Sequence, residues 1–191
     1  GRGRDASAYS AMLGGLRQAI TEYNNVRLFI ELRGRADHEI WRQLLRLDLL
    51  DRTSTFPSVV SVHTLVAQCD ALLFPERYGE IHSIMLESMR DGVPLVVSAD
   101  PALAGIIDAS TAAMVDEPTV EQWSQQLRRL LGHPEEAADR AVRAAQRVRS
   151  AFRRDRQIEI LVETFERMLH GEAYSFDGSS RAGLSDETRP A

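Results

Sequence analysis

The sequence predicts an α/β fold in which a doubly wound parallel sheet of about five strands carries helices on both faces. Short apolar runs, typical of strands buried on both faces, alternate with longer segments whose apolar residues recur every three or four positions. One stretch, 69–100, reads as strand, loop, helix and strand, which is a βαβ unit. Sheets of this kind bind ligands at the carboxyl ends of their strands, so the loop inside this unit is the first candidate site.

The expected strands are short apolar runs, and the expected helices are amphipathic segments between them. Strands are expected at 26–32, 53–60, 71–74, 95–97 and 112–115. Helices are expected at 7–22, 37–50, 61–68, 120–131, 135–152 and 156–169, and another begins at Ser83. Gly92 suits the position just after the end of that helix, and Pro94 prevents its continuation. Trp41 is expected to join the core from the segment 37–50.

The composition describes one globular domain without disulfides. The chain has 191 residues, a formal net charge of −5 and 43% hydrophobic residues. We expect residues 1–169 to form the domain and the polar residues 170–191 to be a disordered tail. The single cysteine, Cys69, excludes a disulfide framework and is expected to be a small buried apolar residue. The acidic balance argues against nucleic acid as a partner, and no run approaches the roughly 20 apolar residues of a membrane span.

The candidate chemistry of the βαβ unit lies at the start of its helix. We expect Ser83 to cap the helix and the amides of Ser83 and Ile84 to be unpaired, which favours an anion such as phosphate. Glu87 follows one turn later, where its carboxylate can accept hydrogen bonds from two neighbouring hydroxyls such as those of a ribose. Glu80 lies in the loop beside Gly79 and can face a reacting sugar.

Two further segments offer contacts to the same ligand. Arg2 and Arg4 precede the first helix, where guanidinium groups can clamp a diphosphate. Gly34 closes the strand 26–32 at the expected site edge. Because the sequence contains no clustered acids, no metal is expected.

The string 76–98, E-R-Y-G-E-I-H-S-I-M-L-E-S-M-R-D-G-V-P-L-V-V-S, resembles the donor-site segment of retaining GT-B glycosyltransferases of the glycosyltransferase family 4 type. That segment carries two glutamates separated by seven residues. Glu87 matches the second, because L-E-S-M-R-D-G-V-P fits on both sides of it. Counting back eight positions reaches Gly79, so the first glutamate is displaced. Glu76 precedes an R-Y-G similar to the family's G-F-G but is three residues too far, and Glu80 is one residue too close. Glu80 is the acid expected to face the donor sugar as the catalytic residue. Arg2 matches the family's G-R, whereas the lysine that follows it in the family is absent.

The resemblance implies a Rossmann-like, C-terminal half of a GT-B enzyme in residues 1–169. Such a half binds a nucleoside diphosphate sugar for retaining transfer of the glycosyl group, and no cofactor or metal is expected if arginines offset the charge of the leaving diphosphate. The sugar or glycolipid acceptor would be held by a preceding domain, so the isolated chain is expected to be inactive. In these enzymes the last helix often crosses onto that domain. A cytoplasmic location is implied, with a peripheral position at the inner membrane face as a variant.

The resemblance also carries an expectation about the sheet. In the family a strand precedes the residues matched by Arg2, and this strand is central. A chain without it should have a gap in its sheet or be completed by another chain.

Three alternatives remain open from the sequence. The displaced glutamate and the absent lysine favour a non-catalytic nucleotide-binding module, a degenerate transferase. A sugar-nucleotide 2-epimerase shares the fold and a donor-site glutamate, but needs further histidines and acids from another domain. A flavodoxin-like domain would need flavin loops or an acidic phosphorylation pocket, and neither is evident.

Overall fold

The protein is described from a computed structural model, which covers residues 5–32, 35–56 and 62–170. In chain order its elements are α1 (Ala6–Ala19), β1 (Leu28–Glu31), α2 (Asp37–Arg46), the 3-10 turn η1 (Leu50–Arg52), β2 (Thr53–Phe56), α3 (Val62–Val66), β3 (Leu72–Phe74), α4 (Ser83–Arg90), β4 (Leu95–Ser98), the 3-10 turn η2 (Pro101–Leu103), β5 (Ala113–Val115), α5 (Val120–Gly132), α6 (Pro134–Ala151) and α7 (Arg154–Leu169). Each expected helix and strand has a counterpart in this order, and the strands are shorter than expected or shifted at their ends.

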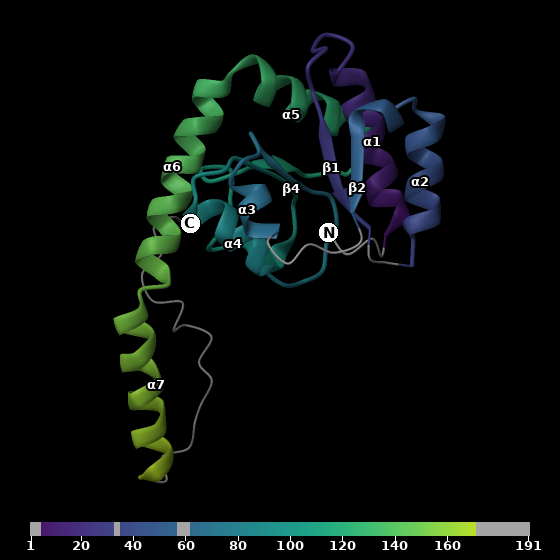
Figure 1. Ribbon diagram of the computed structural model, residues 1–191. Helices are drawn as coiled ribbons and strands as arrows, with labels where there is room; N and C mark the ends of the chain where they lie inside the picture. The colour runs from purple at the N-terminus through teal and green to yellow at the C-terminus, as the bar shows by residue number, and fades with distance from the viewer. Residues whose placement is uncertain (1–4, 33–34, 57–61, 171–191) are drawn as a thin grey trace, which may run out of the picture.

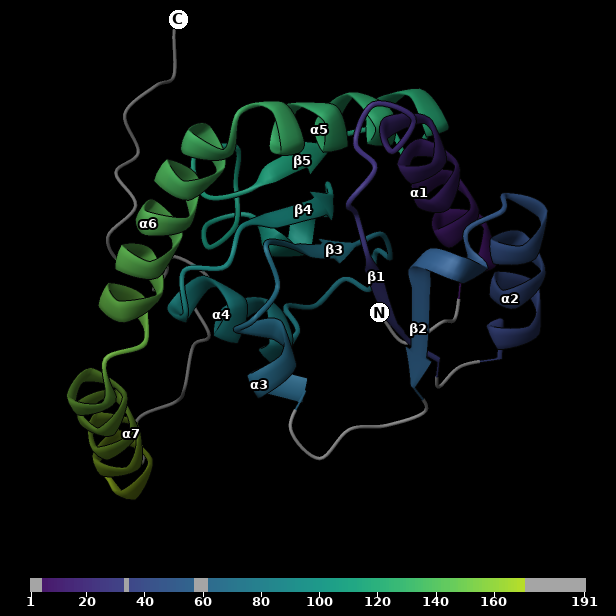
Figure 2. The ribbon, with the colours of Figure 1, turned by 45° about the horizontal axis from the view of Figure 1, so that its top comes forward.

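All strand pairings among the described residues are parallel, which confirms the predicted fold class. The strands nevertheless form two sheets, one of β1 and β2 and one with the order β3-β4-β5. Leu28 is in register with Thr53 in the first sheet, and Leu72 is in register with Leu95 in the second. Among the described residues, β1 and β3 are not hydrogen-bonded to each other, so the two sheets are separate (Figure 2).

Strand β4 shows how helices cover both faces of the larger sheet. All four of its residues are buried, and consecutive side chains alternate between faces. Leu95 and Val97 belong to a core cluster with Met85 of α4, whereas Val96 belongs to a second cluster with Trp123 of α5. In Figure 2, α5 and α4 accordingly lie on opposite faces of β3, β4 and β5.

Helices α1 and α5 approach each other unusually closely. A Cβ atom added to Gly15 of α1 would lie 2.5 Å from the Cβ of Trp123 and 2.7 Å from the backbone nitrogen of Ser124. Backbone atoms cannot move aside as a flexible side chain can, so this contact requires glycine. The two helices and the strands beneath them share one apolar cluster, which includes Ile30 of β1 and Val115 of β5.

Helix α4 ends as the sequence predicts. Asp91 is its last capping residue, and Gly92 follows with a φ of +74°, a conformation that glycine adopts without strain. The amide of Val93 donates to the carbonyl of Ser88, and that of Gly92 donates to the carbonyl of Met89. These two bonds form a Schellman motif, which satisfies the last carbonyls of the helix.

The segment 37–50 departs from expectation. Its helix α2 stops at Arg46, because Asp48 takes a φ of +55° and turns the chain. Trp41, expected in the core, is 45% exposed, since Ile40 and Leu44 on the adjacent side of the helix provide the buried contacts. The helical period of the apolar residues was predicted correctly. The prediction placed more residues on the core-facing side of the helix than the structure does.

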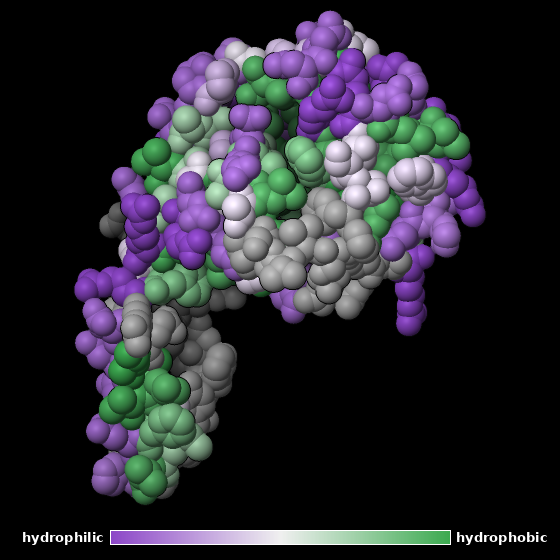
Figure 3. All heavy atoms as spheres, in the orientation of Figure 1, coloured by the Kyte–Doolittle hydropathy of each residue, from purple (hydrophilic) through white to green (hydrophobic). Residues whose placement is uncertain are grey.

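Helix α7 extends away from the rest of the described chain (Figure 1), and Figure 3 shows apolar side chains along it. The large apolar residues exposed on it are Ile158, Ile160, Leu161, Val162, Phe165, Met168 and Leu169. Most of the tail expected at 170–191 lies outside the described residues. None of the helices placed in the structure combines the length and the apolar character that crossing a bilayer requires.

Replacing Gly15 tests the close contact of α1 with α5. Gly15→Ala should lower the free energy of unfolding by about 1–3 kcal/mol, because overpacking against backbone outweighs the gain in helix propensity. Urea unfolding followed by circular dichroism measures it. Gly14→Ala is the control, since its nearest neighbour is a side chain, that of Val120, and it should cost less. Equal stability of Gly15→Ala and wild type would contradict the contact.

Candidate functional site

The candidate site lies in the loop that leads from β3 to α4. This loop starts at the carboxyl end of β3, the edge at which parallel α/β sheets bind ligands. Ser98 at the end of neighbouring β4 fixes the start of the loop, because its buried hydroxyl donates to the carbonyl of Pro75 at 2.7 Å. The loop that carries the predicted site residues therefore begins at the carboxyl end of β3.

The start of α4 differs by one residue from the prediction. His82, not Ser83, is the capping residue: its backbone is extended, and its carbonyl accepts hydrogen bonds from the amides of Met85 and Leu86. Ser83 is the first helical residue and is exposed. Within the described part of the chain, the amides of Ser83 and Ile84 donate to no acceptor, so the helix start retains the two free donors that were expected.

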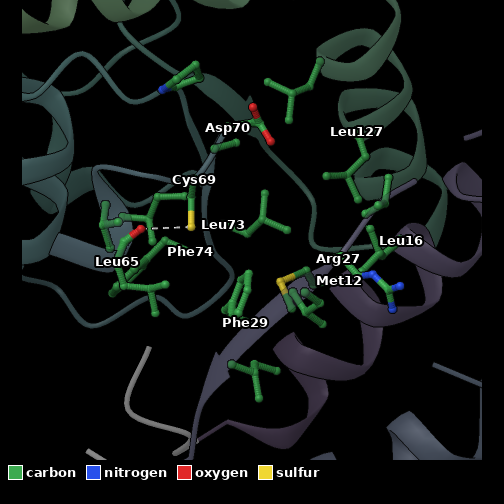
Figure 4. A pocket seen from close by; sticks show the side chains of 18 of the residues that line it. Met12, Leu16, Arg27, Phe29, Leu65, Cys69, Asp70, Leu73, Phe74 and Leu127 are labelled. Carbon is green, nitrogen blue, oxygen red and sulfur yellow. Dashed lines mark hydrogen bonds between the residues drawn. The ribbon is translucent and has the colours of Figure 1, made fainter. Parts of the chain in front are cut away.

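The residues at the helix start line part of a large cavity of about 1840 Å³. His82, Ser83 and Ile84 line one part of it, and apolar side chains from α1, β1, β3 and α5 line another. In Figure 4, Met12, Phe29, Leu73 and Leu127 point toward a common space. The expectation that the helix start faces a cleft agrees with this geometry.

Three aromatic rings, those of Phe74, Tyr78 and His82, pack against one another at the helix start. The ring of His82 lies 5.1 Å from that of Phe74 and 4.8 Å from that of Tyr78, measured between centroids. His82 Nε2 also lies 3.5 Å from Glu80 Oε1. No role was predicted for His82 or Tyr78, because a lone histidine and a loop tyrosine carry no spacing signal.

Glu80, the predicted catalytic acid, is largely exposed, with 59% of its side chain accessible. Its recorded partner is His82, so it borders the helix start without being buried in it. Gly79, which stands where the family has its first glutamate, takes a φ of +70° and donates its amide to Asp100 Oδ2 at 2.8 Å. Asp100 thus fixes the loop at this glycine, a contact that the sequence did not suggest.

Glu87 lies one turn after Ser83, on the same face of α4. It is half-buried, and its Oε2 atom is shielded from solvent. Its carboxylate therefore does not extend into bulk solvent, which is compatible with the predicted contact to a ligand. Arg2, Arg4 and Gly34, the other predicted contacts, lie outside the described residues.

Glu76 is the buried acid of the loop, and it accepts hydrogen bonds from groups of the protein itself. Its side chain is almost inaccessible; Oε1 accepts from the amide of Asp5 at 3.1 Å, and Oε2 accepts from the hydroxyl of Tyr9 at 3.3 Å. These bonds attach the start of α1 to the loop after β3. The start of α1 and the start of α4 are thereby held at the same edge of the molecule.

Asp5 caps α1 beside this contact. It accepts from the hydroxyl of Ser7 at 2.7 Å and from the amides of Ser7 and Ala8. The side-chain hydrogen bond from Ser7 is the main cause that holds the pKa of Asp5 below its ordinary value, and the two amides add to it against the effect of burial.

Cys69, before β3, is half-buried and lines the cavity in surroundings that disfavour its thiolate. Burial raises the pKa of its thiol, and the neighbouring Asp70 carboxylate raises that pKa further. The thiol donates to the carbonyl of Leu65 at 3.3 Å (Figure 4). Because the thiolate is the reactive form, these surroundings disfavour reaction, in line with the structural role expected for this cysteine.

Comparison with known proteins identifies the class. Residues 9–133 match the family described as glycosyl transferases group 1, and the chain belongs to this family. No relative was found among curated proteins. Solved structures with a similar fold are GT-B glycosyltransferases.

Three of these structures illustrate the likeness. Sucrose-phosphate synthase from Thermosynechococcus elongatus superposes with a TM-score of 0.70 at 17% identity, over 85% of this chain and 43% of that one. HepE from Anabaena, solved in complex with UDP, gives 0.67 at 15% identity, over 86% and 56%. The C-terminal domain of the group 1 glycosyl transferase LpcC from Francisella tularensis gives 0.67 at 11% identity, over 78% and 81%. The chain thus spans about half the length of the first two and most of an isolated C-terminal domain.

Replacing Glu76 distinguishes a structural acid from a ligand-binding one. Glu76→Ala removes the acceptor of two hydrogen bonds at a buried place and should lower the free energy of unfolding by about 1–3 kcal/mol. Thermal and urea unfolding measure this loss. Glu80→Ala is the matched control, because Glu80 is exposed and its removal should change stability by less than about 0.5 kcal/mol. A Glu76→Ala protein as stable as wild type would show that Glu76 does not stabilise the attachment of α1 to the loop.

The lowered pKa of Asp5 predicts how the stability of the protein depends on pH. Because its pKa is lower in the folded state than in the unfolded chain, its charge contributes stability above the unfolded value near 4, and this contribution is lost as pH falls through the lowered pKa. Asp5→Asn should therefore be less stable than wild type at pH 7, by up to about 1 kcal/mol, and equal to it at strongly acidic pH. Urea unfolding at both pH values is the measurement. A difference that does not shrink on acidification would mean that the charge of Asp5 is not involved.

Proposed function

We propose that this chain is the donor-binding part of a glycosyltransferase, which binds a nucleoside diphosphate sugar for retaining transfer of its glycosyl group to an acceptor. The observation that carries the proposal is the start of α4: two free backbone amides at the edge of a cavity, with Glu87 one turn further on, in a chain of the glycosyl transferases group 1 family. The complex of HepE with UDP supports a nucleotide donor by analogy.

The diphosphate would lie against the amides of Ser83 and Ile84. The helix dipole and these donors favour negative charge, and charge grows on the leaving diphosphate during transfer. Arg2 and Arg4, which precede α1, are proposed to supply cationic contacts, so no metal ion is required. Gly34 is proposed to border the nucleotide, as glycines at that place do in the family.

Glu87 would hold the ribose, and Glu80 would face the donor sugar. A carboxylate paired with two hydroxyl groups is worth on the order of 1.5–3 kcal/mol. Glu80 is largely exposed and therefore accessible to a ligand, and His82 lies beside it at the helix start. Gly79 leaves space at the place where the family has its first acid, since nothing lies within 4 Å of a Cβ added there.

The acceptor would be bound by another part of the enzyme, so the 191-residue chain alone is expected to bind donor without transferring it. Helix α7 is a suitable contact to that part, because it extends from the body and exposes a run of large apolar side chains along its length (Figures 1 and 3). Exposed apolar surfaces of this kind typically mark a contact with another protein or domain.

Substitution of Glu87 tests the donor site. Glu87→Ala should weaken the best-bound nucleoside diphosphate of a panel by roughly 10- to 100-fold. The 2′,3′-dideoxy analogue should bind wild type weakly and should lose little more on substitution, because the carboxylate and the hydroxyls form one interaction. Isothermal titration calorimetry measures both affinities.

The control for this experiment is Glu121→Ala, which removes an exposed glutamate from the first turn of another helix, α5, and should leave affinity unchanged. Equal affinity of wild type for the ribose and dideoxy forms would contradict the ribose contact. No binding of any nucleoside diphosphate by wild type would contradict the donor site itself.

A non-catalytic nucleotide-binding module is the second candidate. It is favoured by the exposed position of Glu80 and by glycine at the place of the family's first glutamate. The two candidates differ in one measurement made on the complete enzyme. Loss of transfer in Glu80→Gln at unchanged donor affinity supports catalysis, whereas donor binding without any transfer by the wild-type enzyme supports the module.

A further inference from the structure

Asp100 connects two loops at the carboxyl edge of the larger sheet. Its Oδ2 atom accepts from the amide of Gly79 in the loop between β3 and α4 at 2.8 Å, and its Oδ1 atom accepts from the amide of Ala102 at 2.9 Å. Each carboxylate oxygen therefore has a backbone donor of its own, one from each loop. One side chain thereby fixes the loops that follow two hydrogen-bonded strands, β3 and β4.

The local sequence explains why Asp100 takes this place. It is the capping residue of the turn η2, and Pro101, the first residue of that turn, has no amide hydrogen to satisfy. Proline disfavours helical backbone in the residue before it, and Asp100 is extended, with φ −135° and ψ 126°. The amide of Ala99 donates to the carbonyl of Val115 at the end of β5. The backbone that carries the carboxylate is thus fixed on both sides.

Three alternate residues of the loop between β3 and α4 are attached to the ends of β4 and β5. The attached pairs are Pro75 with the hydroxyl of Ser98, Arg77 with the backbone carbonyl of Asp116, and Gly79 with the carboxylate of Asp100. Gly79 is the last of these attachments, and Glu80 follows it directly. Among the described residues, no atom lies within 4 Å of a Cβ added to Gly79, so packing contributes little there and the hydrogen bond fixes the chain.

We infer that Asp100 is a positioning residue of the donor site, which holds Glu80 where it faces the sugar of the donor. The inference rests on the proposed function and adds to it a residue that acts through the loop rather than on the ligand. Because 59% of the Glu80 side chain is accessible, the backbone beside it, rather than packing, sets where its carboxylate reaches. Binding groups need placement to within about 0.5 Å, and attachment to a rigid element such as the end of β4 supplies it.

The rest of the proposed site is held independently of Asp100. The amides at the start of α4 and the carboxylate of Glu87 belong to a helix that Met85 and Met89 anchor in the core, since both side chains are buried. Loss of the contact between Asp100 and Gly79 should therefore displace the part of the loop that faces the sugar and leave the diphosphate and ribose contacts in place. A loss confined to the sugar distinguishes positioning from a general contribution to stability.

Asp100→Asn removes this contact selectively. The single carbonyl oxygen of asparagine can still cap η2 through Ala102, but its other atom is a donor and cannot accept from the amide of Gly79. Hydrogen exchange without ligand should show the change. The amide of Gly79 should exchange about tenfold faster or more in Asp100→Asn than in wild type, whereas the amides of α4 should keep their protection.

Affinity measures the functional role. Isothermal titration calorimetry would compare UDP, ADP and GDP with their glucose, mannose and N-acetylglucosamine conjugates. For the nucleotide that wild type binds best, one conjugate should bind more tightly than the free nucleoside diphosphate. Asp100→Asn should reduce this ratio of affinities by about fivefold or more, because a positioned hydrogen-bonding group is lost. The affinity for the free nucleoside diphosphate should change by less than about twofold.

Asp108→Asn is the matched control. Asp108 also accepts from a backbone amide, that of Ser110, but its other carboxylate oxygen accepts from Arg147 of α6 and not from the loop of the site. This substitution should lower the melting temperature, since it weakens a charged hydrogen bond, and it should leave the ratio of affinities unchanged.

Three results would overturn the inference. They are unchanged exchange of the Gly79 amide in Asp100→Asn, an equal loss of affinity for the conjugate and the free nucleoside diphosphate, and a wild-type protein that binds both alike. The proposed function is contradicted by a different result, the failure of wild type to bind any nucleoside diphosphate, and the inference then falls with it.

Discussion

The packing of α1 against α5 is the contact on which the rest of the described structure depends. Among the residues that the structure describes, the two sheets share no strand pairing, so they are connected by apolar contacts in one cluster that includes Ile30 of β1, Val96 of β4 and Trp123 of α5. Gly15 allows the helices to approach closely enough for this cluster to form. Glu76 adds a polar connection between α1 and the second sheet. If this packing were loosened, β1 and β2 would have little to hold them near β3.

The fold was predictable because its signals are local. The apolar run 95–97 identified the most buried strand, and Gly92 identified the end of α4 through a conformation that glycine alone adopts easily. Features that depend on distant contacts were not predictable to the same degree. Trp41 is exposed because Ile40 and Leu44 already provide the buried face, and sequence period alone does not say how wide that face is.

The candidate site likewise combines features that local sequence predicts with features that depend on distant contacts. The free amides at the start of α4 follow from a helix boundary, so they were predicted correctly even though His82 rather than Ser83 is the cap. The roles of Glu76 and Asp100 depend on partners 71 and 21 residues away in the sequence, and no spacing rule connects them. A buried glutamate and an exposed glutamate in one loop look alike in the sequence. Only their partners separate the acid that stabilises α1 from the acid proposed for the donor sugar.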